Sequence, residues 1–153
     1  DEEIRIDFAT LQKFILSVRD GMPNNPYHNW VHIIDVTQMA FSLAKVSGLW
    51  DQMCGQHRLA LLIAALCHDI EHPGVSASYL QKSQSRLAVW FDNDLGLLEK
   101  HHSVRAFELL ACKNLRLLET LPTDERVALR HLVRDAILAT DMSRHAAYMA
   151  EIE

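Results

Sequence analysis

Apolar side chains in this chain are spaced as they are in helices. Phe8, Leu11 and Ile15 stand three and four positions apart and share one helix face, and the GMPNNP segment of residues 21–26 ends that helix. No segment alternates apolar and polar residues as a half-buried strand does. Comparable spacing and start signals predict further helices over residues 29–46, 56–69, 97–112, 123–139 and 146–153, with short ones from Ser76 or Ser78 to 81 and from Ser85 to 91.

The segment over residues 56–69 is apolar around its whole circumference rather than on one face. A helix without a polar face belongs in the interior, so we expect this one to be the central helix. No internal repeat, low-complexity tract or linker divides the sequence. The pattern therefore predicts an all-α fold, a compact multi-helix bundle forming one unit over residues 1–153.

The charge balance argues against two classes of partner. Lys and Arg number 15 against 20 Asp and Glu, whereas general binders of nucleic acid polymers or membrane surfaces need a basic footprint. The longest apolar run, residues 59–67, is far short of the ~20 residues that span a bilayer. The 3 cysteines lie far apart without a C-x-x-C pair, which favours an intracellular, cytoplasmic location. Because the sequence starts at Asp1 and ends within a predicted helix, we expect a piece of a longer protein.

Histidines gather in two short motifs. In the first, YHNWVH over residues 27–32, His28 and His32 are four positions apart, a spacing that places two imidazoles on one helix face. Such a pair either meets at one binding site or forms ordinary hydrogen bonds at the start of a helix. The motif alone favours the second interpretation.

The second motif, HDIEHPG over residues 68–74, follows the most apolar segment of the chain. Ionised groups at the end of a buried helix cost several kcal/mol unless they are paired or bind a metal. Imidazole nitrogen and carboxylate oxygen suit Zn²⁺, Mn²⁺, Fe²⁺ or Mg²⁺, and the two oxygens of an Asp can bridge two ions. The alternative is structural, with Asp69 capping a helix and His68 hydrogen-bonded in the core.

Together these motifs resemble the catalytic domain of the class I 3′,5′-cyclic-nucleotide phosphodiesterases, members of the HD superfamily of metal-dependent phosphohydrolases. The resemblance extends over most of the chain and keeps the family's motif order. It implies the helical bundle of HD-domain phosphodiesterases and the hydrolysis of cAMP and/or cGMP to 5′-nucleotides, which terminates a signal. Its motifs are YHNWVH at 27–32, HDIEHPG at 68–74, LAVWF at 87–91, LLEKHH at 97–102 and LATDMSRH at 138–145.

The resemblance also implies a role for each matching residue. His32, His68 and Asp69 match ligands of a first ion, expected to be Zn²⁺, and Asp69 also bridges to a second ion, Mg²⁺ or Mn²⁺. The other matches are His28 as general acid, His72, Glu99 and Thr140 as residues that hydrogen-bond the waters of the ions, Tyr27 and Met142 as lining of the nucleotide pocket, and Asp141 in a supporting role.

These roles imply a two-metal mechanism. Two cations neutralise the cyclic phosphodiester and pull the pKa of a bridging water down toward ~7. The hydroxide attacks phosphorus in line while His28 protonates the departing 3′ oxygen of the ribose. Of the adjacent His101 and His102, we expect one to be structural and the other at most to contact a metal ligand without binding the ion itself.

The catalytic domain of this family is longer than the present chain, and its C-terminal part supplies a fourth metal ligand and the residues that hold the base. We therefore expect these 153 residues to be the N-terminal portion of such a domain, with little or no phosphodiesterase activity alone. Two rival hypotheses remain. One is another HD-type phosphohydrolase, and the other is a catalytically silent regulatory or binding module.

Overall fold

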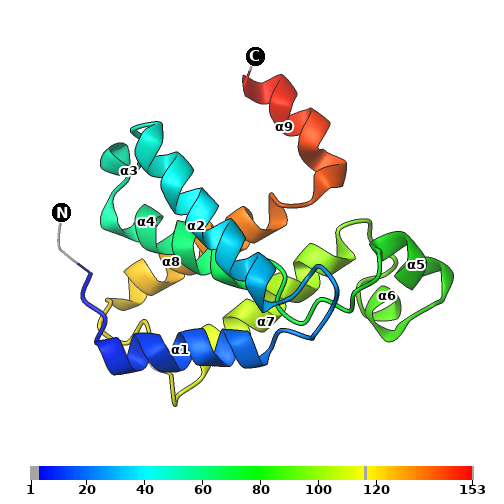
Figure 1. Ribbon diagram of the computed structural model, residues 1–153, viewed down its shortest axis with the longest axis horizontal. Helices are drawn as coiled ribbons and strands as arrows, with labels where there is room; N and C mark the ends of the chain where they lie inside the picture. Colours follow the sequence, from blue (N-terminus) through cyan, green and yellow to red (C-terminus); the bar gives the residue numbers. More distant parts are fainter. Residues whose placement is uncertain (1–3, 116, 153) are drawn as a thin grey trace.

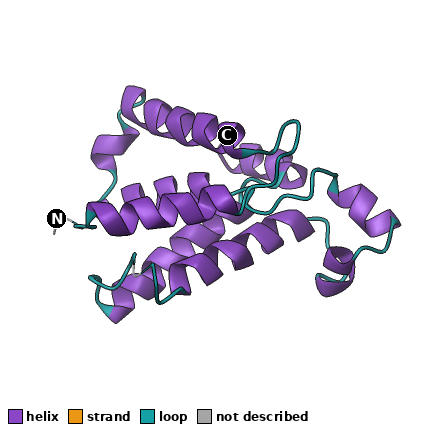
Figure 2. Ribbon diagram, turned by 60° about the horizontal axis from the view of Figure 1, so that its bottom comes forward, coloured by secondary structure: helices purple, strands orange, loops and turns teal. Residues whose placement is uncertain are grey.

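The computed structural model describes residues 4–115 and 117–152, and every regular element within them is a helix (Figures 1 and 2). The all-α prediction is therefore confirmed for the described chain. Among the same residues, no helix combines the length and the apolar character needed to cross a membrane. The elements are α1 (Phe8–Asp20), α2 (Trp30–Val46), α3 (Leu49–Gln52), α4 (Gly55–Cys67), α5 (Ala77–Lys82), α6 (Arg86–Trp90), α7 (Leu97–Ala111), α8 (Thr123–Leu138), the 3-10 turn η1 (Met142–Arg144) and α9 (His145–Ile152).

Side-chain caps explain where several helices begin. The Asp7 carboxylate accepts a hydrogen bond from the backbone N–H of Thr10 and starts α1. Ser76 and Ser85 cap α5 and α6 in the same manner. These short polar side chains satisfy N–H groups of the first turn that have no partner within the helix.

Helix α4 lies at the centre of the bundle and packs against α8 and α2 (Figure 1). Its residues from Ile63 to Cys67 are all buried, together with Leu129 and Val133 of α8. The prediction of a central apolar helix is thus confirmed. Helices α5 and α6 extend from one edge of the bundle, and a smaller cluster of Leu80, Ala88, Leu97 and Leu98 holds them to the start of α7 (Figure 1).

Two local predictions are wrong. The central helix ends at Cys67 rather than at Asp69, because the chain turns there and Glu71 takes a left-handed backbone conformation with φ 57°. The second wrong prediction is the shared helix face of His28 and His32: α2 starts at Trp30, within one residue of its predicted start, because the Asn29 side chain accepts from the N–H groups of its first turn. His28 therefore precedes the helix, and it does not share a helix face with His32.

The shortest elements, α3 and η1, have no counterpart among the sequence predictions. They span too few residues for apolar spacing to show a period. The other helices begin and end within a few residues of the predicted bounds, since caps and breakers mark their ends.

Candidate metal centre

One cavity of about 660 Å³ collects all the site residues that the sequence singled out. It lies where the segment before α2, the turn after α4, the start of α7 and the segment after α8 come together. The predicted site residues on its wall are Tyr27, His28, His32, His68, Asp69, His72, Glu99, Thr140, Asp141 and Met142.

Asp69 is at the centre of this cluster. Its Oδ2 lies 3.2 Å from Nε2 of His32 and 3.2 Å from Nε2 of His68, and its Oδ1 lies 3.7 Å from Nε2 of His102. Burial raises the pKa of Asp69, but the hydrogen bond and charge of His68 outweigh it and hold the pKa well below its usual range. The carboxylate is therefore ionised at neutral pH.

The donor atoms form two groups that share this carboxylate. One comprises His32, His68 and Asp69, and the other His28, Asp69 and His72, with the donor atoms of each group within 4.8 Å of one another. Two imidazoles and a carboxylate are a donor set suited to Zn²⁺ and similar divalent ions. The residues present thus fit the expected metal ion, and a shared carboxylate fits a bridging role.

The ring of His68 is oriented by its backbone contact. Its Nδ1 lies 2.9 Å from the carbonyl of Ala65, which can only accept, so Nδ1 carries the proton and Nε2 faces Asp69. Burial lowers the pKa of His68, but the hydrogen bond and charge of Asp69 raise it by more than burial lowers it. The net shift of the pKa is therefore upward. The Asp69 carboxylate thus stabilises a positive charge on the neighbouring ring.

His72 is oriented the opposite way. Its Nδ1 accepts from the N–H of Gly74 at 3.0 Å, so the neutral ring carries its proton on Nε2. The ring stacks on that of His28, with centroids 3.7 Å apart. An Nε2–H donor suits a hydrogen bond to water better than a bond to a metal ion, which agrees with the role that the resemblance implies.

His102 is the site residue that sequence reasoning only partly identified. Its Nδ1 donates to the carbonyl of Ile70 at 2.7 Å, and its Nε2, directed toward Asp69, is buried without a hydrogen-bond partner. A buried acceptor without a partner is rare and points to a donor such as an ordered water at this position. The two adjacent histidines, His101 and His102, indicated a site residue at this position. The side chains of adjacent residues on a helix point in different directions, however, and only the fold shows that His102 is the one that enters the site.

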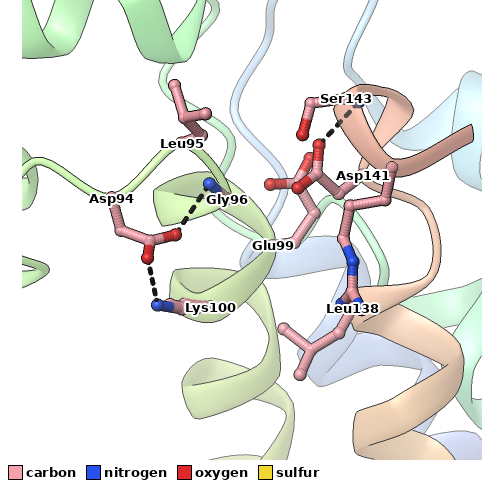
Figure 3. A pocket seen from close by; sticks show the side chains of 9 residues that line it. Asp94, Leu95, Gly96, Glu99, Lys100, Leu138, Asp141 and Ser143 are labelled. Carbon is pink, nitrogen blue, oxygen red and sulfur yellow. Dashed lines mark hydrogen bonds and ion pairs between the residues drawn. The ribbon is translucent and has the colours of Figure 1, made fainter. Parts of the chain in front are cut away.

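Glu99 and Asp141 line both this cavity and a neighbouring pocket of about 390 Å³ (Figure 3). Burial, followed by the charges of Asp141 and Asp69, raises the pKa of Glu99. Asp94 of this pocket pairs with Lys100 at 2.7 Å, as Figure 3 shows. Among the remaining predicted residues, Thr140 donates its hydroxyl to the carbonyl of Ile137, and Tyr27 and Met142 are exposed on the cavity wall.

We expect the metal-free protein to lose stability as the pH falls from about 6.5 to about 4. Burial, aided by the charge of His28, lowers the pKa of His72 to about 4, and burial lowers that of His102 to about 3. Between these values and the unfolded pKa near 6.5, the unfolded chain binds protons that the folded chain does not. Each group then costs roughly 2–3 kcal/mol of unfolding free energy by pH 4.5.

His68 acts in the opposite sense, because its raised pKa favours folding most at pH below the unfolded value and offsets part of the loss. Urea denaturation in EDTA at pH 7 and pH 4.5 measures the difference. His102→Asn should flatten the pH dependence, whereas His131→Asn, at an exposed position of α8, should not. The prediction would be contradicted if the unfolding free energies of wild type and His102→Asn changed equally between pH 7 and pH 4.5.

The sequence is similar to those of known phosphodiesterases. The family model described as "3'5'-cyclic nucleotide phosphodiesterase" matches residues 27–153. A mouse high affinity cGMP-specific 3',5'-cyclic phosphodiesterase 9A is 37% identical over 96% of this chain and 27% of its own length. A rat 3',5'-cyclic-AMP phosphodiesterase 4C is 36% identical over 97% of this chain and 28% of its own length. This chain thus spans about a quarter of such curated relatives.

A solved structure gives the same result for the fold. The phosphodiesterase domain of Salpingoeca rosetta rhodopsin phosphodiesterase superposes with a TM-score of 0.90 and 36% sequence identity. The match covers 95% of this chain and 44% of that structure.

Proposed function

This chain belongs to the 3'5'-cyclic nucleotide phosphodiesterase family, and from that premise we propose that it is the N-terminal part of a catalytic domain that hydrolyses 3′,5′-cyclic nucleotides to 5′-nucleotides. The similar proteins include cGMP-specific and cAMP enzymes, so the proposed substrate is cAMP, cGMP or both. A cytoplasmic location is proposed with it, supported by three free cysteine thiols.

The observation that carries this proposal is the convergence of His32, His68 and Asp69. These side chains come from α2 and from the turn after α4, and their donor atoms lie within 4.8 Å of one another on the cavity wall. We propose that His32, His68 and Asp69 would hold Zn²⁺, and that Asp69 would also contribute to a neighbouring site for Mg²⁺ or Mn²⁺. Burial lowers the pKa of His32 despite the nearby carboxylate, which keeps its ring neutral and able to bind a metal at neutral pH.

When bound, such cations would neutralise the phosphodiester and acidify a water molecule. The protein residues do the rest. His72, Glu99 and Thr140 are proposed to hold waters in place through hydrogen bonds, and Tyr27 and Met142 to contact the nucleotide, with Asp141 in a supporting role. His28 stands at the cavity wall, stacked on His72, where it can give a proton to the departing 3′ oxygen.

Hydrolysis assays combined with metal analysis test this proposal. A protein that joins this chain to the remaining length of a phosphodiesterase domain should contain stoichiometric Zn²⁺ and hydrolyse cAMP or cGMP when Mg²⁺ is added. The 153 residues alone should show little or no turnover. Near-normal turnover by the short chain would contradict the second expectation.

The rival hypotheses give different results in the same assays. A catalytically silent module would carry no stoichiometric Zn²⁺, and His68→Ala would leave its thermal response to metal unchanged. Another HD-type phosphohydrolase would bind metal but cleave phosphate monoesters in preference to cyclic diesters. Either outcome would overturn the proposed activity.

A further inference from the structure

The turn that carries His68, Asp69 and His72 contains a residue in an unfavourable backbone conformation. Glu71 has φ 57°, in the left-handed region that residues with a Cβ seldom adopt. Its N–H donates to the carbonyl of Gly21 at 3.1 Å, which ties the turn to the end of α1. The conformation therefore needs contacts that hold it in place.

The side chain of Glu71 supplies such a contact with α7. Its Oε1 lies 2.6 Å from Nη2 of Arg105, and its Oε2 lies 3.6 Å from Nε2 of His101. Arg105 is itself fixed by a second ion pair through Nη1 to Glu108, one turn along the same helix. Neither Glu71 nor Arg105 lines the cavity of the candidate metal centre.

The backbone of Glu71 sets the direction of its neighbours in the turn. The N–H of His72 donates to the carbonyl of Asp69 at 3.0 Å, and the carbonyl of His72 accepts from Asn25 at 2.8 Å. The carbonyl of Ile70 accepts from His102. A change of φ at residue 71 would break this set of bonds and redirect the Asp69 carboxylate and the His72 ring.

From this geometry we infer that Glu71 and Arg105 are positioning residues for the metal centre. Their ion pair holds the turn in the left-handed conformation that directs Asp69 and His72 into the cavity. The inference rests on the proposed function, since it assumes that the cavity binds a divalent metal ion. It assigns a role to two residues that touch neither metal nor substrate.

Titration of the metal-free protein with Co²⁺, followed by its visible absorption, tests this inference. Arg105→Leu removes the charge, and we expect its Co²⁺ affinity to be about threefold to tenfold weaker, with an altered spectrum. The loss of Co²⁺ affinity should not exceed the loss caused by changing a residue that is hydrogen-bonded directly to a metal ligand, because the ion pair of Glu71 and Arg105 is partly exposed. The matched control is Arg134→Leu, which removes a half-exposed arginine paired with Asp135 on α8 and should change neither property.

A rescue separates positioning from general stability. Glycine adopts φ near 57° without strain, so Glu71→Gly placed on the Arg105→Leu background should restore the affinity to within about twofold of wild type. Arg105→Lys should retain an intermediate affinity and guards against a folding defect in the leucine variant. Wild-type affinity and spectrum in Arg105→Leu, or no rescue by glycine, would overturn the inference. Absence of Co²⁺ binding by the wild type would instead overturn the proposed function.

Discussion

Asp69→Asn is expected to abolish tight binding of divalent metal ions and, with it, phosphodiesterase activity of the longer protein. Asn keeps the shape of the side chain but removes the negative charge that both donor groups share. The loss of metal affinity should exceed the roughly 10- to 100-fold loss that follows removal of a residue hydrogen-bonded to a metal ligand. Calorimetric titration of the metal-free protein with Zn²⁺ measures it directly.

Asp135→Asn is the matched control. Asp135 is an exposed carboxylate on α8 that pairs only with its neighbour Arg134 among the contacts described, and its loss should leave Zn²⁺ binding and turnover unchanged. An Asp69→Asn variant that binds Zn²⁺ as tightly as wild type would show that the histidines form the site without a carboxylate. The proposed bridging role would then be wrong.

The long helices could be predicted from the sequence because their signals are local. The apolar circumference predicted for residues 56–69 indicates burial regardless of what surrounds the helix. Ser85 marks a helix start because its side chain caps the backbone N–H of Ala88, only three residues away. The end of the central helix at Cys67 could not be predicted in this way. It depends on Glu71, whose conformation is held by Gly21 and Arg105 from other parts of the chain.

The candidate site shows the same division. Family resemblance predicted His32, His68 and Asp69 as metal ligands, and the fold brings His32 within reach of His68 and Asp69 across more than thirty positions of sequence. The helical spacing of His28 and His32 was the wrong reason for their proximity, because His28 precedes α2 and reaches the site by stacking on His72. The pairing of Glu71 with Arg105 has no local signal, because it joins residues far apart in the sequence.

His28→Asn is expected to lower kcat of the longer protein by about 10²- to 10⁴-fold while Zn²⁺ binding is retained. The reason is that the 3′ oxygen of ribose is a poor leaving group and needs a proton as it departs. A p-nitrophenyl ester of a 5′-nucleotide has a leaving group that departs without a proton, so its hydrolysis should suffer much less from the same change. The measurement is the ratio of kcat for the two substrates in wild type and variant.

This ratio also decides between the two roles that the geometry allows His28. As general acid it acts on the leaving group, and the effect of His28→Asn then depends on the substrate. As a metal ligand beside Asp69 it would act on the ion, so both substrates would lose rate equally and metal binding would weaken. A uniform loss accompanied by weaker Zn²⁺ or Mg²⁺ binding would therefore reassign His28 from acid to ligand, and the proton for the 3′ oxygen would have to come from another group on the cavity wall.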